Sequence, residues 1–178
     1  IGVGGLPGGQ PRWLLVTALL PEGVDRDRAS GIFDNLCEAC RSAGVSLVGG
    51  HTEITVGLDR PILVGCLLGT VRRERLVRTS GARPGDAVLL TGGIAIEGTA
   101  ILAREHREEL LSRGVATDII ERAAGWLRKP GISVLQAARA IHATGDAHAM
   151  HDPTEGGVAT GLSELAEAAG VKLRINWA

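Results

Sequence analysis

The stretch that most constrains this chain is Met150–Gly157, MHDPTEGG, which is followed by a helical pattern over 158–169. It places the carboxylate of Asp152, a turn set by proline and the glycines Gly156 and Gly157 directly before a helix. The first N–H groups of a helix have no partner within the helix and lie at the positive end of its dipole. The layout is therefore suited to holding an anion.

Two side chains in this stretch have further predicted roles. Thr154 can cap the helix. Asp152 is the acid that lies off the helix, so it is the natural contact for a metal ion. Magnesium fits best, because it needs only one or two protein carboxylates besides substrate phosphates. The alternative is that Thr154 caps an ordinary helix after an ordinary loop.

Three short apolar segments each run into a glycine pair with a hydroxyl or an acid beside it. Phosphates favour cradles of backbone N–H groups, so three such strand ends favour a polyphosphate site. None of them matches a P-loop or the Gly-x-Gly-x-x-Gly dinucleotide pattern. The predicted nucleotide- or phosphate-binding residues are Gly49, Gly50, His51, Thr52, Thr91, Gly92, Gly93, Thr154, Gly156 and Gly157.

Hydrophobic periodicity predicts alternating strands and helices, hence an α/β or α+β fold with layered helices. The first strand is expected to be buried on both faces, and Asp25 and Gly44 are expected to bound the first helix. Thr117 or Asp118 is expected to cap a later one. The predicted strands are 13–20, 45–48, 62–71, 87–90, 147–150 and 171–177, and the predicted helices are 26–43, 97–113, 117–129, 132–143 and 158–169.

The best domain boundary is Ala82–Asp86, ARPGD, which has turn chemistry. It divides the chain into parts covering 1–80 and 81–178. The chain starts in a Gly/Pro-rich loop and stops at a strand with no evident partner. We therefore expect a fragment with two partial domains.

Composition excludes several classes of function. The 178 residues are 44% hydrophobic and 22% charged, which is typical of a globular protein. A net charge of −1 and only four aromatic residues (Trp 3, Phe 1) argue against nucleic-acid binding. There is no apolar run of transmembrane length, so no membrane partner is expected. Three cysteines without a disulfide framework fit a reducing, cytoplasmic location.

Histidines supply further candidates. His51, with Glu53 two residues on, can contact phosphate or transfer a proton, or it is simply a hydrogen-bonded loop residue. His148 and His151, together with Asp152, hint at a metal cluster. Their spacing matches no standard zinc pattern.

Cys37 and Cys40 form a lone Cys-x-x-Cys on the apolar face of the helix at 26–43. Redox or metal chemistry is one interpretation, and a pair of buried thiols is the better one. The basic residues that follow the strand at 62–71 are most simply a solvated connection, although one of them could reach a phosphate. They are Arg72, Arg73, Arg75 and Arg78.

Taken in order, Val48–Glu53, Leu90–Gly93 and His151–Gly157 resemble the aminoimidazole ribonucleotide synthetase-like (PurM-like) superfamily. That group includes selenophosphate synthetase and thiamine monophosphate kinase. The third motif looks most like the hydrogenase-maturation branch, whose members dehydrate a carbamoylated cysteine.

The resemblance implies an N-terminal α/β domain that dimerises through a β-barrel and a C-terminal domain of layered sheet and helices. Here both domains would be partial. It also implies ATP bound with Mg²⁺ between them, a homodimer, and a small-molecule substrate or a maturation partner protein. The matching positions are Gly49, Gly50, His51 and Thr52 for the nucleotide, Asp152 for magnesium, and Gly156 and Gly157 for the helix start.

The sequence also departs from this pattern. Relatives carry an upstream Gly-Asp-Asp-type acidic cluster that supplies most magnesium ligands, and nothing like it precedes Trp13. The C-terminal domain is expected to be cut short after Trp177. The expected function is ATP-dependent phosphoryl transfer in the complete parent, activating a small substrate or a protein-bound carbamoyl group. The fragment itself is expected to be inactive, and its catalytic residues are unknown.

Two other classes of function stay open. A non-catalytic dimerisation or regulatory module could retain the fold without the chemistry. A redox or metal-binding protein could use Cys37, Cys40 and the histidines.

Overall fold

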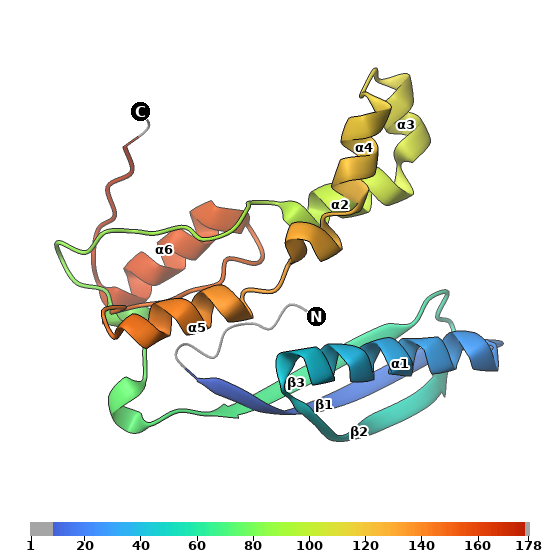
Figure 1. The fold of residues 1–178 in the computed structure, drawn as a ribbon, viewed down its shortest axis with the longest axis horizontal. Coiled ribbons are helices and arrows are strands. Elements are labelled where there is room, and N and C mark those ends of the chain that lie inside the picture. The colour runs from blue at the N-terminus through green and yellow to red at the C-terminus, as the bar shows by residue number, and fades with distance from the viewer. Residues whose placement is uncertain (1–8, 177–178) are drawn as a thin grey trace. The chain divides into compact units, whose positions relative to one another are not determined.

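The computed structural model describes residues 9–176. The chain divides between Leu76 and Val77 into two compact units (Figure 1). One holds a three-stranded sheet with a helix, and the other is built from helices and extended segments. The predicted class, a mixed α/β fold, is confirmed.

The first unit is organised around its central strand. β1 (Gln10–Pro21) lies between β2 (Ser46–Thr55) and β3 (Ile62–Thr70), parallel to β2 and antiparallel to β3. A parallel pair needs a crossover connection, which α1 (Arg26–Ala43) supplies.

Helix α1 begins and ends where its local signals predict. The Asp25 carboxylate accepts a hydrogen bond of 2.7 Å from the Arg28 N–H, which satisfies one of the donors left open at the helix start. Gly44 adopts the left-handed conformation, with φ 70°, and ends the helix.

The core of this unit lies between α1 and one face of the sheet (Figure 1). Leu14 and Val16 of β1 pack there with Leu36 and Cys40 of α1. The prediction that this strand is buried on both faces is wrong, because the described chain covers only one face of the sheet. Side chains that alternate with the core residues are exposed or half-buried, and Trp13 is 42% exposed.

The second strand is longer than predicted. β2 runs on through Gly49–Thr52, so this motif lies inside a strand and not at the end of one. The reason is the length of β1, whose residues pair with β2 as far as Pro21 and Thr55. Gly50 has φ 144°, and a Cβ there would overlap the carbonyl oxygen of Val16. Close packing of the two strands therefore already requires this glycine.

In the second unit, α2 (Ile96–Glu105), α3 (Arg107–Ser112) and α4 (Thr117–Ala124) pack on one another as a helical hairpin (Figure 1). α2 packs against α4 through small and branched side chains, including Ala103 and Ile120. Two short 3-10 turns, η1 (Arg73–Arg75) and η2 (Thr79–Gly81), lie on either side of the division between the units. The other elements are the π-type turn η3 (Leu127–Gly131), α5 (Leu135–Thr144) and α6 (Gly157–Ala169).

Helix boundaries differ from the predictions where local geometry intervenes. The predicted helix 97–113 is broken at His106, whose φ of −117° and ψ of 31° lie outside the helical range. The residue preceding α4 is Ala116, which has no capping side chain, so the prediction that Thr117 or Asp118 caps this helix is wrong. α4 also ends five residues before 129, and α5 starts at Leu135 instead of 132.

Three predicted strands are absent from residues 77–176. Segments 87–90, 147–150 and 171–176 have no strand pairing there, and Trp177 of the third lies outside the described residues. A strand exists only when a neighbour completes its hydrogen-bond ladder. The apolar sequence alone does not provide one: Leu89 is 81% exposed. Across residues 9–176, no helix is both long and apolar enough to cross a membrane.

Candidate functional site

The loop 150–157 leads directly into α6 and is packed against η2. The carbonyl oxygen of Met150 accepts a hydrogen bond of 3.4 Å from the Thr79 hydroxyl, and η2 contacts α6. A Cβ at Gly81 would overlap the carbonyl oxygen of His148. Residues 148–150 are thus held in place by contacts with residues 79–81, which are distant in sequence.

The start of α6 also packs closely on the loop. Gly161 is buried, and a Cβ there would lie 2.7 Å from the Pro153 Cβ. Gly156 has φ 75°, which favours glycine, and a Cβ there would overlap the Thr160 hydroxyl. Both glycines let the loop and the helix approach each other.

The predicted Thr154 cap is wrong. The residue preceding α6 is Gly156, and no side chain caps this helix. The Thr154 hydroxyl instead donates a hydrogen bond of 3.3 Å to the Asp152 carbonyl oxygen, within the loop. The Gly157 N–H donates a hydrogen bond of 3.4 Å to the Thr154 carbonyl oxygen, and no side chain caps the donors that follow it at the start of α6.

A histidine links the loop to α6. His151 Nε2 lies 2.7 Å from Oε2 of Glu164, and its Nδ1 lies 3.9 Å from Oδ1 of Asp152. The His151 side chain is 24% exposed, against 57% for Glu164 and 39% for Asp152. One ring thus stands between a carboxylate of the loop and a carboxylate of the helix.

A contact between His148 and Asp86 holds the residues that precede the loop 150–157. His148 Nδ1 lies 2.8 Å from Oδ1 of Asp86, whose other oxygen accepts a hydrogen bond of 2.8 Å from the Arg83 N–H. The Arg83 N–H foremost, and then the His148 contact, hold the pKa of the Asp86 carboxyl below its usual range. The predicted turn at 82–86 is thereby joined to His148, two residues before the loop 150–157.

The predicted metal cluster of His148, His151 and Asp152 does not form. The two histidines turn to different carboxylates, Asp86 and Glu164. In the part of the chain that the structure describes, no three His, Cys, Asp or Glu side chains are grouped to hold a metal ion. Asp152 with its loop fits a magnesium ion only when phosphate oxygens and water supply the other ligands.

The other predicted site residues lie elsewhere. Thr91, Gly92 and Gly93 form part of the extended segment before α2, with Gly92 at φ 75°. Gly49–Thr52 lie in β2, in the other unit. His51 is 68% exposed and lies 3.7 Å from Glu53 as an ion pair.

The two cysteines of the Cys-x-x-Cys do not share an environment. Cys40 is buried and Cys37 is exposed, so the interpretation of both as buried thiols is wrong for Cys37. The buried stripe of α1 runs through Leu36 and Cys40, four residues apart, and Cys37 lies beside it. Burial, and then the nearby Cys37, raise the pKa of the Cys40 thiol.

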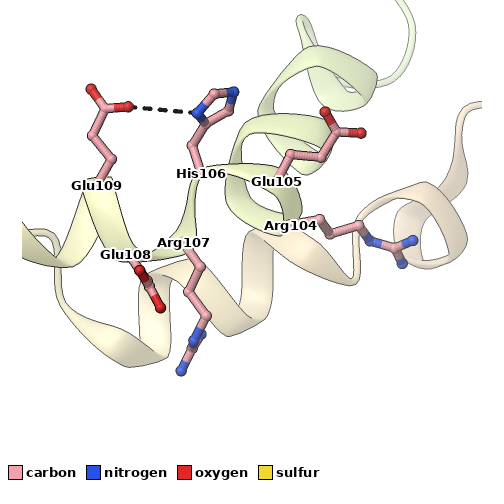
Figure 2. A pocket seen from close by; sticks show the side chains of 6 residues that line it. All are labelled: Arg104, Glu105, His106, Arg107, Glu108 and Glu109. Carbon is pink, nitrogen blue, oxygen red and sulfur yellow. Dashed lines mark ion pairs between the residues drawn. The ribbon is translucent and has the colours of Figure 1, made fainter. Parts of the chain in front are cut away.

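A hollow of about 490 Å³ lies at the junction of α2 and α3 and contains none of the predicted site residues (Figure 2). Its basic side chains have partners within the helical hairpin. His106 pairs with Glu109 at 3.5 Å, and Arg107 pairs with Glu121 at 3.5 Å. Arg104 donates a hydrogen bond of 2.7 Å to the Ala124 carbonyl oxygen. The Arg107 and Arg104 contacts join α4 to α3 and α2, and the His106 contact is local to the start of α3.

Sequence reasoning missed Glu164 and Asp86 as partners of the loop. Glu164 is 13 residues from His151, and Asp86 is 62 from His148. No spacing rule connects residues so far apart. Only the packing of α6 and of the 82–86 turn on the loop brings them together.

Comparisons with known proteins match both halves of the chain. Residues 6–71 match AIR synthase related protein, N-terminal domain, and residues 83–178 match AIR synthase related protein, C-terminal domain. Carbamoyl dehydratase HypE of Cupriavidus necator is 31% identical over 93% of this chain and 44% of its own length. Selenide, water dikinase of Yersinia pestis is 31% identical over 96% of this chain and 45% of its own length.

Solved structures show the same similarity. Hydrogenase maturation protein HypE in complex with ATP is 28% identical, with a TM-score of 0.72 over 92% of this chain and 46% of that chain. A HypE–HypF complex contains a chain that is 26% identical, with a TM-score of 0.73 over 93% of this chain and 51% of that one. The chain thus spans about half the length of the relatives it matches.

Proposed function

Because this chain belongs to the AIR synthase related family, matching both its N-terminal and its C-terminal domain, we propose that the complete protein transfers a phosphoryl group from ATP. The transfer activates a small substrate or a protein-bound carbamoyl group. Two kinds of relative support these alternatives, a selenide, water dikinase for the first and a carbamoyl dehydratase for the second. The relative solved in complex with ATP supports the nucleotide.

The observation that carries the proposal is the loop 150–157 at the uncapped start of α6. Asp152 contributes a carboxylate there, and phosphate oxygens would accept from N–H groups at the start of α6, which no side chain caps. Asp152 would hold Mg²⁺, and Thr154, Gly156 and Gly157 would contact the phosphates. The ion would neutralise charge on the phosphate oxygens when bound.

The remaining contacts of the nucleotide are proposed on the family motifs. They are Gly49, Gly50, His51 and Thr52 of β2 and Thr91, Gly92 and Gly93 before α2.

The test is a calorimetric titration of Mg·ATP into this chain and into Asp152→Ala. If Asp152 holds the metal, we expect the variant to bind at least about tenfold more weakly. Asp118→Ala, which removes an exposed carboxylate of α4, is the matched control and should bind like the wild type. Saturable binding that Asp152→Ala leaves unchanged would remove Asp152 from the site.

One observation favours the non-catalytic alternative: the described residues contain no group of three acidic, histidine or cysteine ligands for a metal. Phosphoryl transfer depends heavily on charge neutralisation by metal ions. The same titration separates the two proposals. If the complete protein fails to bind Mg·ATP in this titration, a dimerisation or regulatory module is supported.

We also propose a homodimer and a maturation partner protein. The sheet face opposite α1 exposes apolar side chains from two adjacent strands, among them Trp13, Leu15, Val64 and Leu68. Exposed apolar faces of this kind mark interfaces. The HypE–HypF complex supports a partner protein for this family branch.

Sedimentation velocity tests the dimer. The wild type should sediment as a dimer, and Val64→Lys should shift it to monomer, because a charge would then be buried in the interface. Arg60→Ala, in the exposed turn before β3, should leave the dimer intact. A wild type that stays monomeric at high concentration would contradict the proposal.

A further inference from the structure

The contact with Glu164 determines which nitrogen of the His151 ring carries the hydrogen. An ionised carboxylate can only accept hydrogen bonds, so at 2.7 Å from Glu164 Oε2 it is Nε2 that carries the hydrogen and donates it. In the neutral ring Nδ1 is then an acceptor with a lone pair. It lies 3.9 Å from Asp152 Oδ1, which is too far for a direct hydrogen bond and suits a contact through water.

We propose that His151 is a second binding group of the Asp152 site and that Glu164 is the positioning residue that fixes its tautomer. Magnesium gives up its water reluctantly and keeps several water molecules when it binds proteins. His151 Nδ1 and the Asp152 carboxylate are two neighbouring acceptors for such water. The inference rests on the proposed function, since it takes Asp152 as the metal contact.

The surroundings of the ring support a positioning role. Most of the His151 side chain is covered, and the loop that carries it is packed on Gly161 and bonded to Thr79. Its orientation is therefore limited, and the remaining freedom lies in which nitrogen bears the hydrogen. Without Glu164, the hydrogen could move to Nδ1, which would then donate to nearby water and no longer accept from it.

Nitrogen-15 NMR of the imidazole rings in the whole chain reads the tautomer of the neutral ring directly. We expect His151 to carry its hydrogen on Nε2 in the wild type. Glu164→Gln should preserve this tautomer, because the glutamine carbonyl oxygen can accept the same bond. Glu164→Ala should shift hydrogen to Nδ1. Glu167→Ala, an exposed residue of the same helix, is the control and should match the wild type.

A calorimetric double-mutant cycle with Mg·ATP tests the role in binding. His151→Ala should weaken binding about tenfold, as loss of an outer-shell partner typically does. Glu164→Ala should weaken it about threefold in the wild-type background and not at all in the His151→Ala background, because it acts through the ring. Glu164→Gln should bind like the wild type.

The possible results separate this inference from the proposed function. The inference is overturned if Glu164→Ala leaves the His151 tautomer unchanged. It is also overturned if Glu164→Ala weakens binding as much in the His151→Ala background as in the wild type. Neither result contradicts Mg·ATP binding itself. A wild type that does not bind Mg·ATP overturns the proposed function and the binding role of His151. The tautomer of Glu164→Ala then still decides whether Glu164 positions the ring.

Discussion

At the scale of single residues, Asp86 gives a prediction about pH. Its pKa is lowered below the ordinary value of 3.8 in the folded chain, so its contribution to stability is fully present above that value. This contribution is lost as the pH falls through the lower folded-state pKa. We therefore expect Asp86→Asn to be less stable than the wild type at about pH 6 and the difference to shrink on acidification.

Urea unfolding at a series of pH values checks this, with Asp118→Asn as a control on an exposed carboxylate of α4. A difference between Asp86→Asn and the wild type that stays constant down to acidic pH would contradict it.

Gly161 gives a second prediction at this scale. A methyl group there would lie 2.7 Å from Pro153 Cβ and 3.2 Å from its Cα, so helix and loop would have to move apart. We expect Gly161→Ala to lower the free energy of unfolding by about 1–3 kcal/mol, the usual cost of overpacking. Thermal and urea unfolding measure this change.

Gly98 in α2 is the matched control, because a Cβ there meets nothing within 4 Å. Gly98→Ala should raise the stability by about 0.5–1 kcal/mol through helix propensity alone. Equal effects of the two substitutions would show that the contact with Pro153 does not matter.

At the scale of elements, α1 shows how one helix face separates two cysteines. Cys40 lies on the buried stripe with a raised thiol pKa, and Cys37 and Cys66 are exposed. Since the thiolate is the reactive form, iodoacetamide should label Cys37 well before Cys40 in the native chain. Peptide mass spectrometry over time measures the rates. In urea the two rates should converge, and rapid native labelling of Cys40 would contradict the packing of α1.

Elements that depend on local signals alone were predicted best. The bounds of α1 follow from Asp25 and Gly44, and both caps are present. β2 was predicted too short, because its length is set by its pairing with β1. The apolar segment 87–90 was predicted as a strand and has no pairing partner in the described chain.

At the scale of the whole molecule, the division at Leu76 and Val77 gives a prediction about cleavage. Several arginines lie close to it, and Arg72, Arg73 and Arg78 are exposed. Limited digestion with trypsin should therefore cut first within 72–78 and leave two resistant fragments, because exposed connections are cleaved before packed elements. Mass spectrometry of the first products checks this. First cuts inside α1 or α5, which also contain arginines, would contradict the division into two units.

The sequence by itself determined the mixed α/β class, the caps of α1 and the position of Asp152, Gly156 and Gly157 at the start of a helix. These depend on periodicity, turn chemistry and helix-end signals, which act over a few residues. Only the tertiary structure decided that β2 continues through Gly49–Thr52, that Gly156 and not Thr154 precedes α6, and that Glu164 and Asp86 hold the loop. Strand pairing and contacts between distant side chains form only when separate segments pack together, so no local pattern encodes them.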